Sequence, residues 1–198
     1  MSPALSGGYP ALVFVAFTPA QSIPLTLVTP RLIIKGTIET RLHRVADIFN
    51  EPDSMHLVLS DAVFAEVGSR RVVAEAALAQ IPLADVLFAH TSEPIASTSE
   101  ARVPKQLVRA TLILSPFTVE GQIHLSYESE LRIALQAYEG RFLPVTEAKY
   151  WAYSVAESPM AVDLLLVNHA LAHIAVASVS GWRAEAPPAE RPDQSRPW

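Results

Sequence analysis

The alternation of apolar and polar residues predicts a chain built mostly of short strands. Segments 25–28 and 111–114 are apolar and run into turns that contain a proline, and the residue before a proline favours extended backbone. Longer stretches at 57–67 and 142–153 are rich in β-branched and aromatic residues, which is typical of strands. We therefore expect a mainly β fold.

Two short helices are predicted to interrupt the strands. Each is indicated by apolar residues spaced three and four apart, which places them on one helical face. These residues are Val45, Ile48 and Phe49 in the first helix and Leu131, Ala134, Leu135 and Tyr138 in the second. Pro52 should prevent the first helix from continuing, because proline lacks the backbone N–H that a helix interior needs.

The last apolar segments of the two halves, 72–89 and 164–177, are predicted to be buried strands. A helix remains an alternative, because 74–79 is rich in alanine, which favours helices. Pro82 favours a break in the middle of the first of these segments.

Several landmarks recur along the chain in the same order, which predicts an internal repeat. Gly36 and Gly121 lie 85 residues apart, and each is followed two residues later by an isoleucine. Asp61 and Glu147 lie 86 residues apart, and each stands between a hydroxyl residue and an alanine. We interpret these four residues as the landmarks of one β-rich unit that is written twice in tandem.

The repeat divides the chain into parts. Toward the end of each copy the separation widens to 88, where 77–80 aligns with 165–168. The expected parts are an N-terminal extension (1–24), a first β-rich unit (25–91), a linker (92–106), a second β-rich unit (107–180) and a disordered proline-rich tail (183–198). The predicted fold is mainly β, of α+β type, with two similar barrel-like or roll-like units that each contain one short helix.

The amino-acid composition excludes several classes of function. A chain that is 50% hydrophobic and 18% charged can bury a sizeable core. The chain has 15 Lys and Arg residues but 20 Asp and Glu residues, and the basic residues form no run. A nucleic-acid partner is therefore not expected. The absence of cysteine rules out disulfides, thiolate metal sites and a cysteine nucleophile. These features are compatible with a cytoplasmic protein, the location we expect.

No targeting or membrane segment is predicted. The apolar stretch 11–17 is short and no basic residue precedes Arg31, which is a poor signal peptide. Segment 162–182 is apolar enough to raise the question of a membrane span, but it carries Asp163 and several other polar residues, which are unfavourable in hydrocarbon. We expect no membrane span.

Two weak metal candidates stand out, His169 and His173, which lie four residues apart and would share a face of a helix or a strand. A zinc site needs further ligands, and the intervening residues include no glutamate base, so we favour a structural role for the pair. No cofactor is implied.

Two other groups of residues invite a catalytic or binding role. Asp61 and Glu147 invite an acid–base role as a carboxylate pair, but an acid beside a hydroxyl residue commonly stabilises a strand-to-turn boundary. Tyr150, Trp151 and Tyr153 offer a surface for stacking, although neighbouring aromatic residues in a strand more often contribute to the core and its cover. No catalytic residue is therefore predicted.

Blocks 44–50 and 57–62, together with 121–125 and 141–148, resemble a small bacterial domain family of unknown function. That resemblance implies a compact β-rich unit and no assigned activity.

A weaker resemblance lies in 53–62, which is similar to the signature of Sm-like RNA-binding proteins, small five-stranded barrels that form rings. His56 stands where that family has an RNA-contacting asparagine, and no Arg-Gly pair follows around 88–90. The resemblance implies a barrel-like topology, while the RNA site does not transfer.

Together these features favour a non-catalytic interaction or scaffold protein that self-associates as a homo-oligomer or binds a protein partner. The alternative is a ligand-binding or nucleic-acid-binding regulatory module of Sm-like type. An enzyme is not expected, because no convergent set of polar residues suggests an active site.

Overall fold

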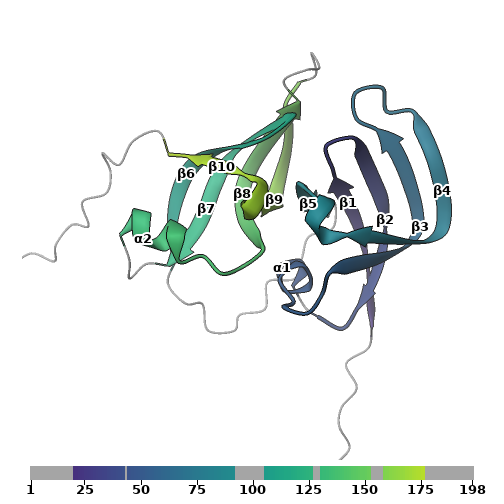
Figure 1. The fold of residues 1–198 in the computed structure, drawn as a ribbon, viewed down its shortest axis with the longest axis horizontal. Helices are drawn as coiled ribbons and strands as arrows, with labels where there is room; N and C mark the ends of the chain where they lie inside the picture. The colour runs from purple at the N-terminus through teal and green to yellow at the C-terminus, as the bar shows by residue number, and fades with distance from the viewer. Residues whose placement is uncertain (1–19, 43, 92–104, 127–129, 153–157, 177–198) are drawn as a thin grey trace, which may run out of the picture.

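The computed structural model describes residues 20–42, 44–91, 105–126, 130–152 and 158–176. The predicted tail, most of the predicted extension and linker, and Tyr153 lie outside these residues. The described residues form ten strands that join in one open antiparallel sheet, in the order β10-β6-β7-β8-β9-β5-β1-β2-β3-β4 (Figure 1). The mainly β prediction is therefore confirmed, and the chain folds as one continuous sheet.

The two halves contain elements in the same order. The first half contains β1 (Gln21–Val28), β2 (Leu32–Thr40), α1 (Val45–Phe49), β3 (His56–Glu66), β4 (Val72–Pro82), the 3-10 turn η1 (Leu83–Asp85) and β5 (Phe88–His90). The second contains β6 (Lys105–Leu114), β7 (Phe117–Ser126), α2 (Leu131–Gln136), β8 (Phe142–Ala152), β9 (Met160–Asn168), the 3-10 turn η2 (His169–Leu171) and β10 (His173–Ala175). The first strand of each half begins before the unit boundary expected from the sequence.

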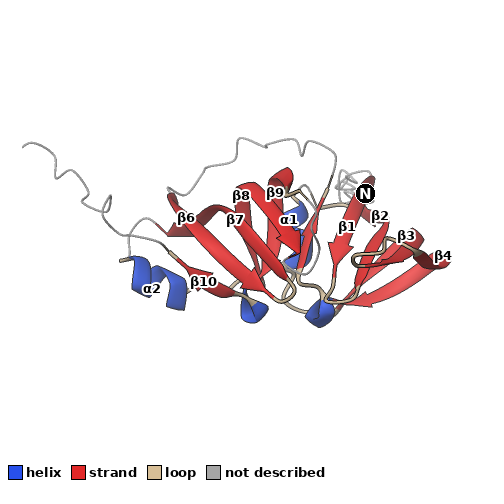
Figure 2. Ribbon diagram, turned by 90° about the horizontal axis from the view of Figure 1, so that it is seen from above, coloured by secondary structure: helices blue, strands red, loops and turns tan. Residues whose placement is uncertain are grey.

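Both predicted helices are present. The predicted apolar face of α1 is buried through Val45, Ile48 and Phe49, and α1 ends three residues before Pro52. Helix α2 buries Ala134. Figure 2 shows α1 beside the middle of the sheet, where the two halves meet.

The last segments are strands rather than helices, and Pro82 is followed directly by η1, as the predicted break required. Their predicted burial is wrong for β4, where ten of the eleven positions are exposed or only partly buried. The reason is topological, because β4 is the last strand of the sheet and pairs only with β3 among the described strands. The end of β9 is buried, since β5 lies beside it.

Each half bends at a bulge opposite a glycine. The β2–β3 ladder pairs Lys35 with Val63 and Thr37 with Ser60, so two residues of β3 oppose Gly36. One of those two residues is Asp61, whose φ is 50°. A non-glycine residue at such a φ is uncommon and marks a local distortion.

The same geometry recurs in the second half. The β7–β8 ladder shifts between Glu120 and Gln122, and Glu147 also has a φ of 50° opposite Gly121. Both acids therefore lie within strands, and the predicted strand-to-turn boundary is wrong. Their place is set by the close approach that a glycine without a side chain permits.

The core is shared between the halves. One buried cluster centres on the first half but includes Phe142 and Leu166 from the second. The other centres on the second half but includes Val28 and Phe88 from the first. This exchange of apolar residues joins the halves through packing as well as through the sheet.

Candidate functional site

The joint between the halves is a short strand contact. Strand β5 pairs with β9, with Phe88 opposite Val167 and Ala89 opposite Leu166. Beyond the ladder, the Asn168 backbone N–H donates to the Leu87 carbonyl at 2.9 Å and its side-chain amide donates to the Val86 carbonyl at 3.1 Å. All of these residues are buried, so the β9 edge is closed by its neighbour.

A side-chain amide reinforces the same joint. Asn50, which follows α1, accepts a hydrogen bond from the Phe142 N–H at 2.7 Å and donates one to the Phe142 carbonyl at 3.0 Å. The rings of Phe49 and Phe142 meet edge to face, 4.9 Å apart. Asn50 thus acts like one residue of an extra strand pair between the two halves.

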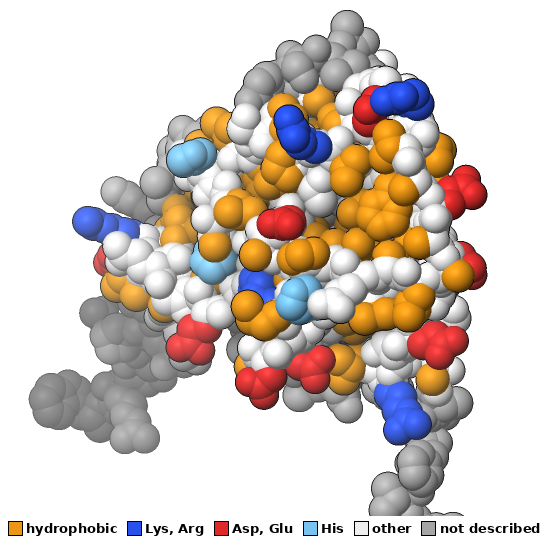
Figure 3. Space-filling model, turned by 45° about the vertical axis from the view of Figure 1, so that its right-hand side comes forward, with side chains coloured by type: hydrophobic (Ala, Val, Ile, Leu, Met, Phe, Trp, Pro, Cys, Tyr) orange, Lys and Arg blue, Asp and Glu red, His pale blue; other side chains and the backbone are white. Residues whose placement is uncertain are grey.

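The β4 edge, defined as Val72–Pro82, has no such cover among the described residues. Its large apolar side chains are open to solvent: Val72 is 51% exposed, Val73 45% and Leu78 67%. Glu75 is its one charged residue. Figure 3, which brings this end of the sheet forward, shows hydrophobic side chains gathered across the face with most acidic side chains at its margins.

An exposed, apolar edge strand can bind another strand. It presents unpaired backbone N–H and C=O groups that can pair with another strand, and proteins usually protect such edges with charges, prolines or short length. The β4 edge is eleven residues long and its proline stands at the very end. Its arrangement therefore suits strand addition.

The predicted histidine pair does not converge on a metal. His169 lies in η2, where its ring packs edge to face on Tyr138 at 5.2 Å, and His173 begins β10. Among the described residues no group of three histidine, cysteine or acidic side chains is placed to bind an ion. Tyr138 donates to the Phe142 carbonyl at 2.7 Å, and burial raises the pKa of Tyr138 to about 12.

The two predicted acids, Asp61 and Glu147, both lie at β-bulges. Glu147 accepts a hydrogen bond from the Gln122 side chain at 2.6 Å, and both Glu147 and Asp61 are exposed. Of the predicted aromatic residues, Tyr150 and Trp151 line a cavity at the joint. His173, from the predicted histidine pair, lines a different pocket together with Leu171 and Ile113.

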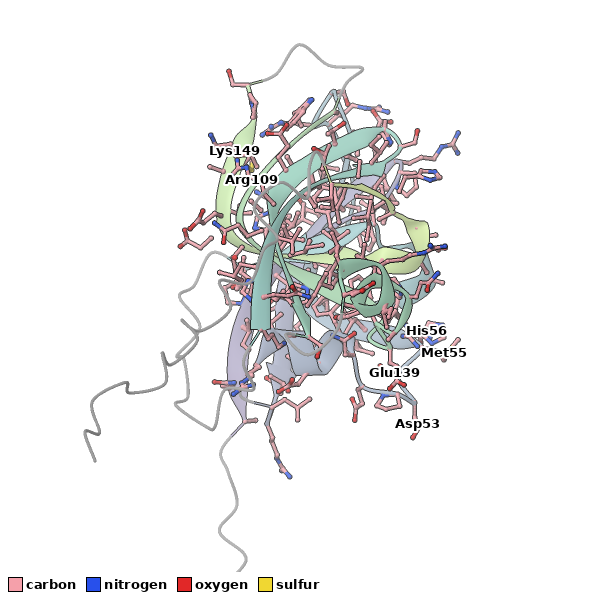
Figure 4. The ribbon with its side chains drawn as sticks, turned by 90° about the vertical axis from the view of Figure 1, so that its left-hand side faces the viewer. Asp53, Met55, His56, Arg109, Glu139 and Lys149 are labelled. Atoms are coloured by element: carbon pink, nitrogen blue, oxygen red, sulfur yellow. The ribbon has the colours of Figure 1, made fainter. Side chains whose placement is uncertain are left out.

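Within the Sm-like signature, the Ser54 carbonyl accepts a hydrogen bond from the Arg141 side chain, whereas Arg109 and Lys149 lie apart from the signature (Figure 4). Figure 4 shows Asp53, Met55 and His56 at one end of the molecule, whereas Arg109 and Lys149 lie toward the other end. The signature therefore forms no common site with these two cations.

The exposure of the β4 edge was not predicted from the sequence. A signal was present, because eleven residues rich in valine, alanine and leucine with a single charge fit a solvent-exposed strand poorly. In the sequence, the same apolar character predicts burial within the chain.

Comparisons with models of protein families, with curated proteins and with solved structures find no match for this chain. Both family resemblances therefore stay hypotheses that rest on their own residues. In the described part of the chain, no helix has the length and apolar character needed to cross a membrane.

Proposed function

We propose that this protein is a non-catalytic scaffold that self-associates by strand addition at the β4 edge. The observation that carries the proposal is the eleven-residue outer strand, whose Leu78 side chain is 67% exposed. Fully burying a leucine contributes about 1.5–3 kcal/mol, so covering this edge is favourable.

The chain itself suggests how the edge is covered. We propose that the two halves are tandem copies of one barrel-like unit, supported by their equal order of elements and by the matching bulges opposite Gly36 and Gly121. In that relation β4 of the first half corresponds to β9 of the second. Since β9 receives β5 from the other half, β4 lacks the strand that its counterpart has.

The missing strand is available at the other end of the sheet. Strand β10 corresponds to β5 and is the opposite outer strand. Pairing β10 of one copy with β4 of the next repeats the β5–β9 contact between molecules. Such a head-to-tail contact generates a closed ring or an open filament, depending on whether the rotation closes.

The first test is the mass of the particle in solution. Size-exclusion chromatography with light scattering should show a multimer whose population grows with concentration. Leu78→Lys should weaken association at least tenfold, because a charge at the edge is unfavourable in a strand pair. Ile133→Lys is the matched control, since Ile133 is 51% exposed on α2, away from the edge.

The second test identifies the strand that pairs with β4. The Ala89–Leu166 pair of the internal joint corresponds to Ile174 of one copy opposite Gln80 of the next. Because the chain has no cysteine, Gln80→Cys and Ile174→Cys proteins can be mixed and oxidised to give one defined disulfide.

Heterodimers of these two variants support the head-to-tail arrangement. Disulfide homodimers of Gln80→Cys alone would instead indicate β4 pairing with itself and would exclude β10 as the partner strand. A monomer at all concentrations, unchanged by Leu78→Lys, would overturn the proposed function.

A further inference from the structure

A cavity of about 300 Å³ lies at the joint, on the side of the sheet opposite the first half's core. One wall comes from the outward face of β1, β2 and β3 through Thr26, Ile33 and Val63. The other comes from the end of β8 and the start of β9 through Trp151 and Met160. Its volume is at the lower end of ligand pockets, which span about 300–1,000 Å³.

The cavity has an aromatic and apolar interior. The Tyr150 ring packs 6.5 Å from Phe117 and 5.9 Å from His90, and all three line the cavity. Tyr150 donates its hydroxyl proton to the Met160 sulfur at 2.8 Å, and its oxygen lies 3.3 Å from His90 Nε2. These contacts fix the aromatic wall before any ligand arrives, which lowers the entropic penalty of binding.

The charges around the cavity have one sign. Among its described lining residues, Lys35 and Arg70 are basic and none is acidic, although the whole chain carries a net charge of -5. Burial and the positive charge of Lys35 lower the pKa of His90, so this imidazole is neutral at pH 7. The cavity is therefore lined mainly by apolar side chains, together with two basic residues and one neutral imidazole.

We infer that this cavity binds a small carboxylate with a flat apolar body, which inserts between Phe117, Trp151 and Val63 while its carboxylate pairs with Lys35. Lys35 is exposed at the mouth, so its ammonium group can reach the carboxylate without being buried. Leu78, the residue changed to test self-association, does not line the cavity, although Val72 at the start of the β4 edge does.

The test uses two probes of equal shape, naphthalene-2-carboxylate and its neutral analogue naphthalene-2-carboxamide. Isothermal titration calorimetry on the full chain should show one site that binds the carboxylate at least tenfold more tightly than the amide. Lys35→Gln should remove that preference and leave amide binding unchanged. Lys149→Gln is the matched control, because Lys149 is exposed on β8 and does not line the cavity.

A space-filling variant locates the site. Ala65 lines the cavity, so Ala65→Phe should abolish binding of both probes, while Leu78→Lys should bind as the wild type does. Equal affinity of the two probes, no binding of either, or a carboxylate preference that survives Lys35→Gln would overturn the inference. Binding retained by a folded Ala65→Phe protein would place the ligand elsewhere and would overturn it as well.

Discussion

Replacing Gly121 by alanine tests whether the bulge in β8 depends on the absence of a side chain. A Cβ at Gly121 would lie 2.5 Å from Val145 Cγ1 and 2.9 Å from the Thr146 carbonyl oxygen. Ordinary carbon contacts lie at about 3.5–4.0 Å, so the new methyl group overlaps Val145 by about 1 Å. Gly36, the matched position, is less crowded, since its Cβ would lie 3.0 Å from the Ser60 carbonyl oxygen.

The size of the effect follows from how far the neighbours can move. Val145 is fully buried, and the other two contacts at Gly121, with Thr146 and Ala148, are with backbone, so none of the three can give way cheaply. Overpacking of this kind lowers the free energy of unfolding by about 1–3 kcal/mol. Replacing glycine also restricts the unfolded chain, which raises the free energy of unfolding by about 0.4–1 kcal/mol. We expect Gly121→Ala to lower the free energy of unfolding by about 1–2 kcal/mol, the difference between these two effects. We expect Gly36→Ala to lower it by less than about 1 kcal/mol, because a small backbone shift relieves its contacts.

Urea unfolding followed by far-ultraviolet circular dichroism measures both variants against the wild type. The comparison is internal, because the two glycines occupy matching positions in the two halves. A Gly121→Ala protein as stable as the wild type, or a Gly36→Ala protein less stable than Gly121→Ala, would contradict this prediction.

Two further predictions concern the joint. Asn50→Ala should lower the free energy of unfolding by about 2 kcal/mol, because the buried Phe142 N–H loses its acceptor while the Phe142 carbonyl keeps the Tyr138 hydroxyl. Urea unfolding measures it, and Asn50→Asp, which keeps an acceptor, should be milder. The folded-state pKa of His90 lies below its ordinary value of 6.5, so the stability that neutral His90 contributes is present above pH 6.5 and is lost as the pH falls through the lowered pKa. His90→Gln should therefore flatten the decline of stability below pH 6.5, and an unchanged pH profile would contradict this reasoning.

Local patterns in the sequence predicted the local structure well. The three-and-four spacing of Val45, Ile48 and Phe49 predicted α1, and Pro82 marked the end of β4, because both effects act within a few residues. The stretch 57–67, rich in β-branched and aromatic residues, is a strand over most of its length, as predicted. The landmark glycines were found, but their reason was not, since crowding against a neighbouring strand is a tertiary effect.

Longer-range features were harder to predict. The expected separation of 88 residues near the end of each copy is wrong for the strand register, because the ladders place Leu78 opposite Ser60 and Leu164 opposite Thr146, a separation of 86. Repeated alanines and leucines match equally well in several registers, whereas the ladder admits only one. The cavity could not be found either, because Lys35 and Trp151 come from different halves, which are brought together by tertiary contacts such as the β5–β9 pairing.

The difference between the inner and outer edges indicates how strong self-association should be. At the internal joint, the contact is made by fully buried apolar residues such as Phe88 and Val167. The corresponding outer residues are His173 and Ile81, and Ile81 is the one buried residue in β4. A head-to-tail contact would therefore bury less apolar surface than the joint within one chain. Since apolar burial supplies most of the free energy of such contacts, copies should associate reversibly and in a concentration-dependent way, while the two halves of each chain stay joined.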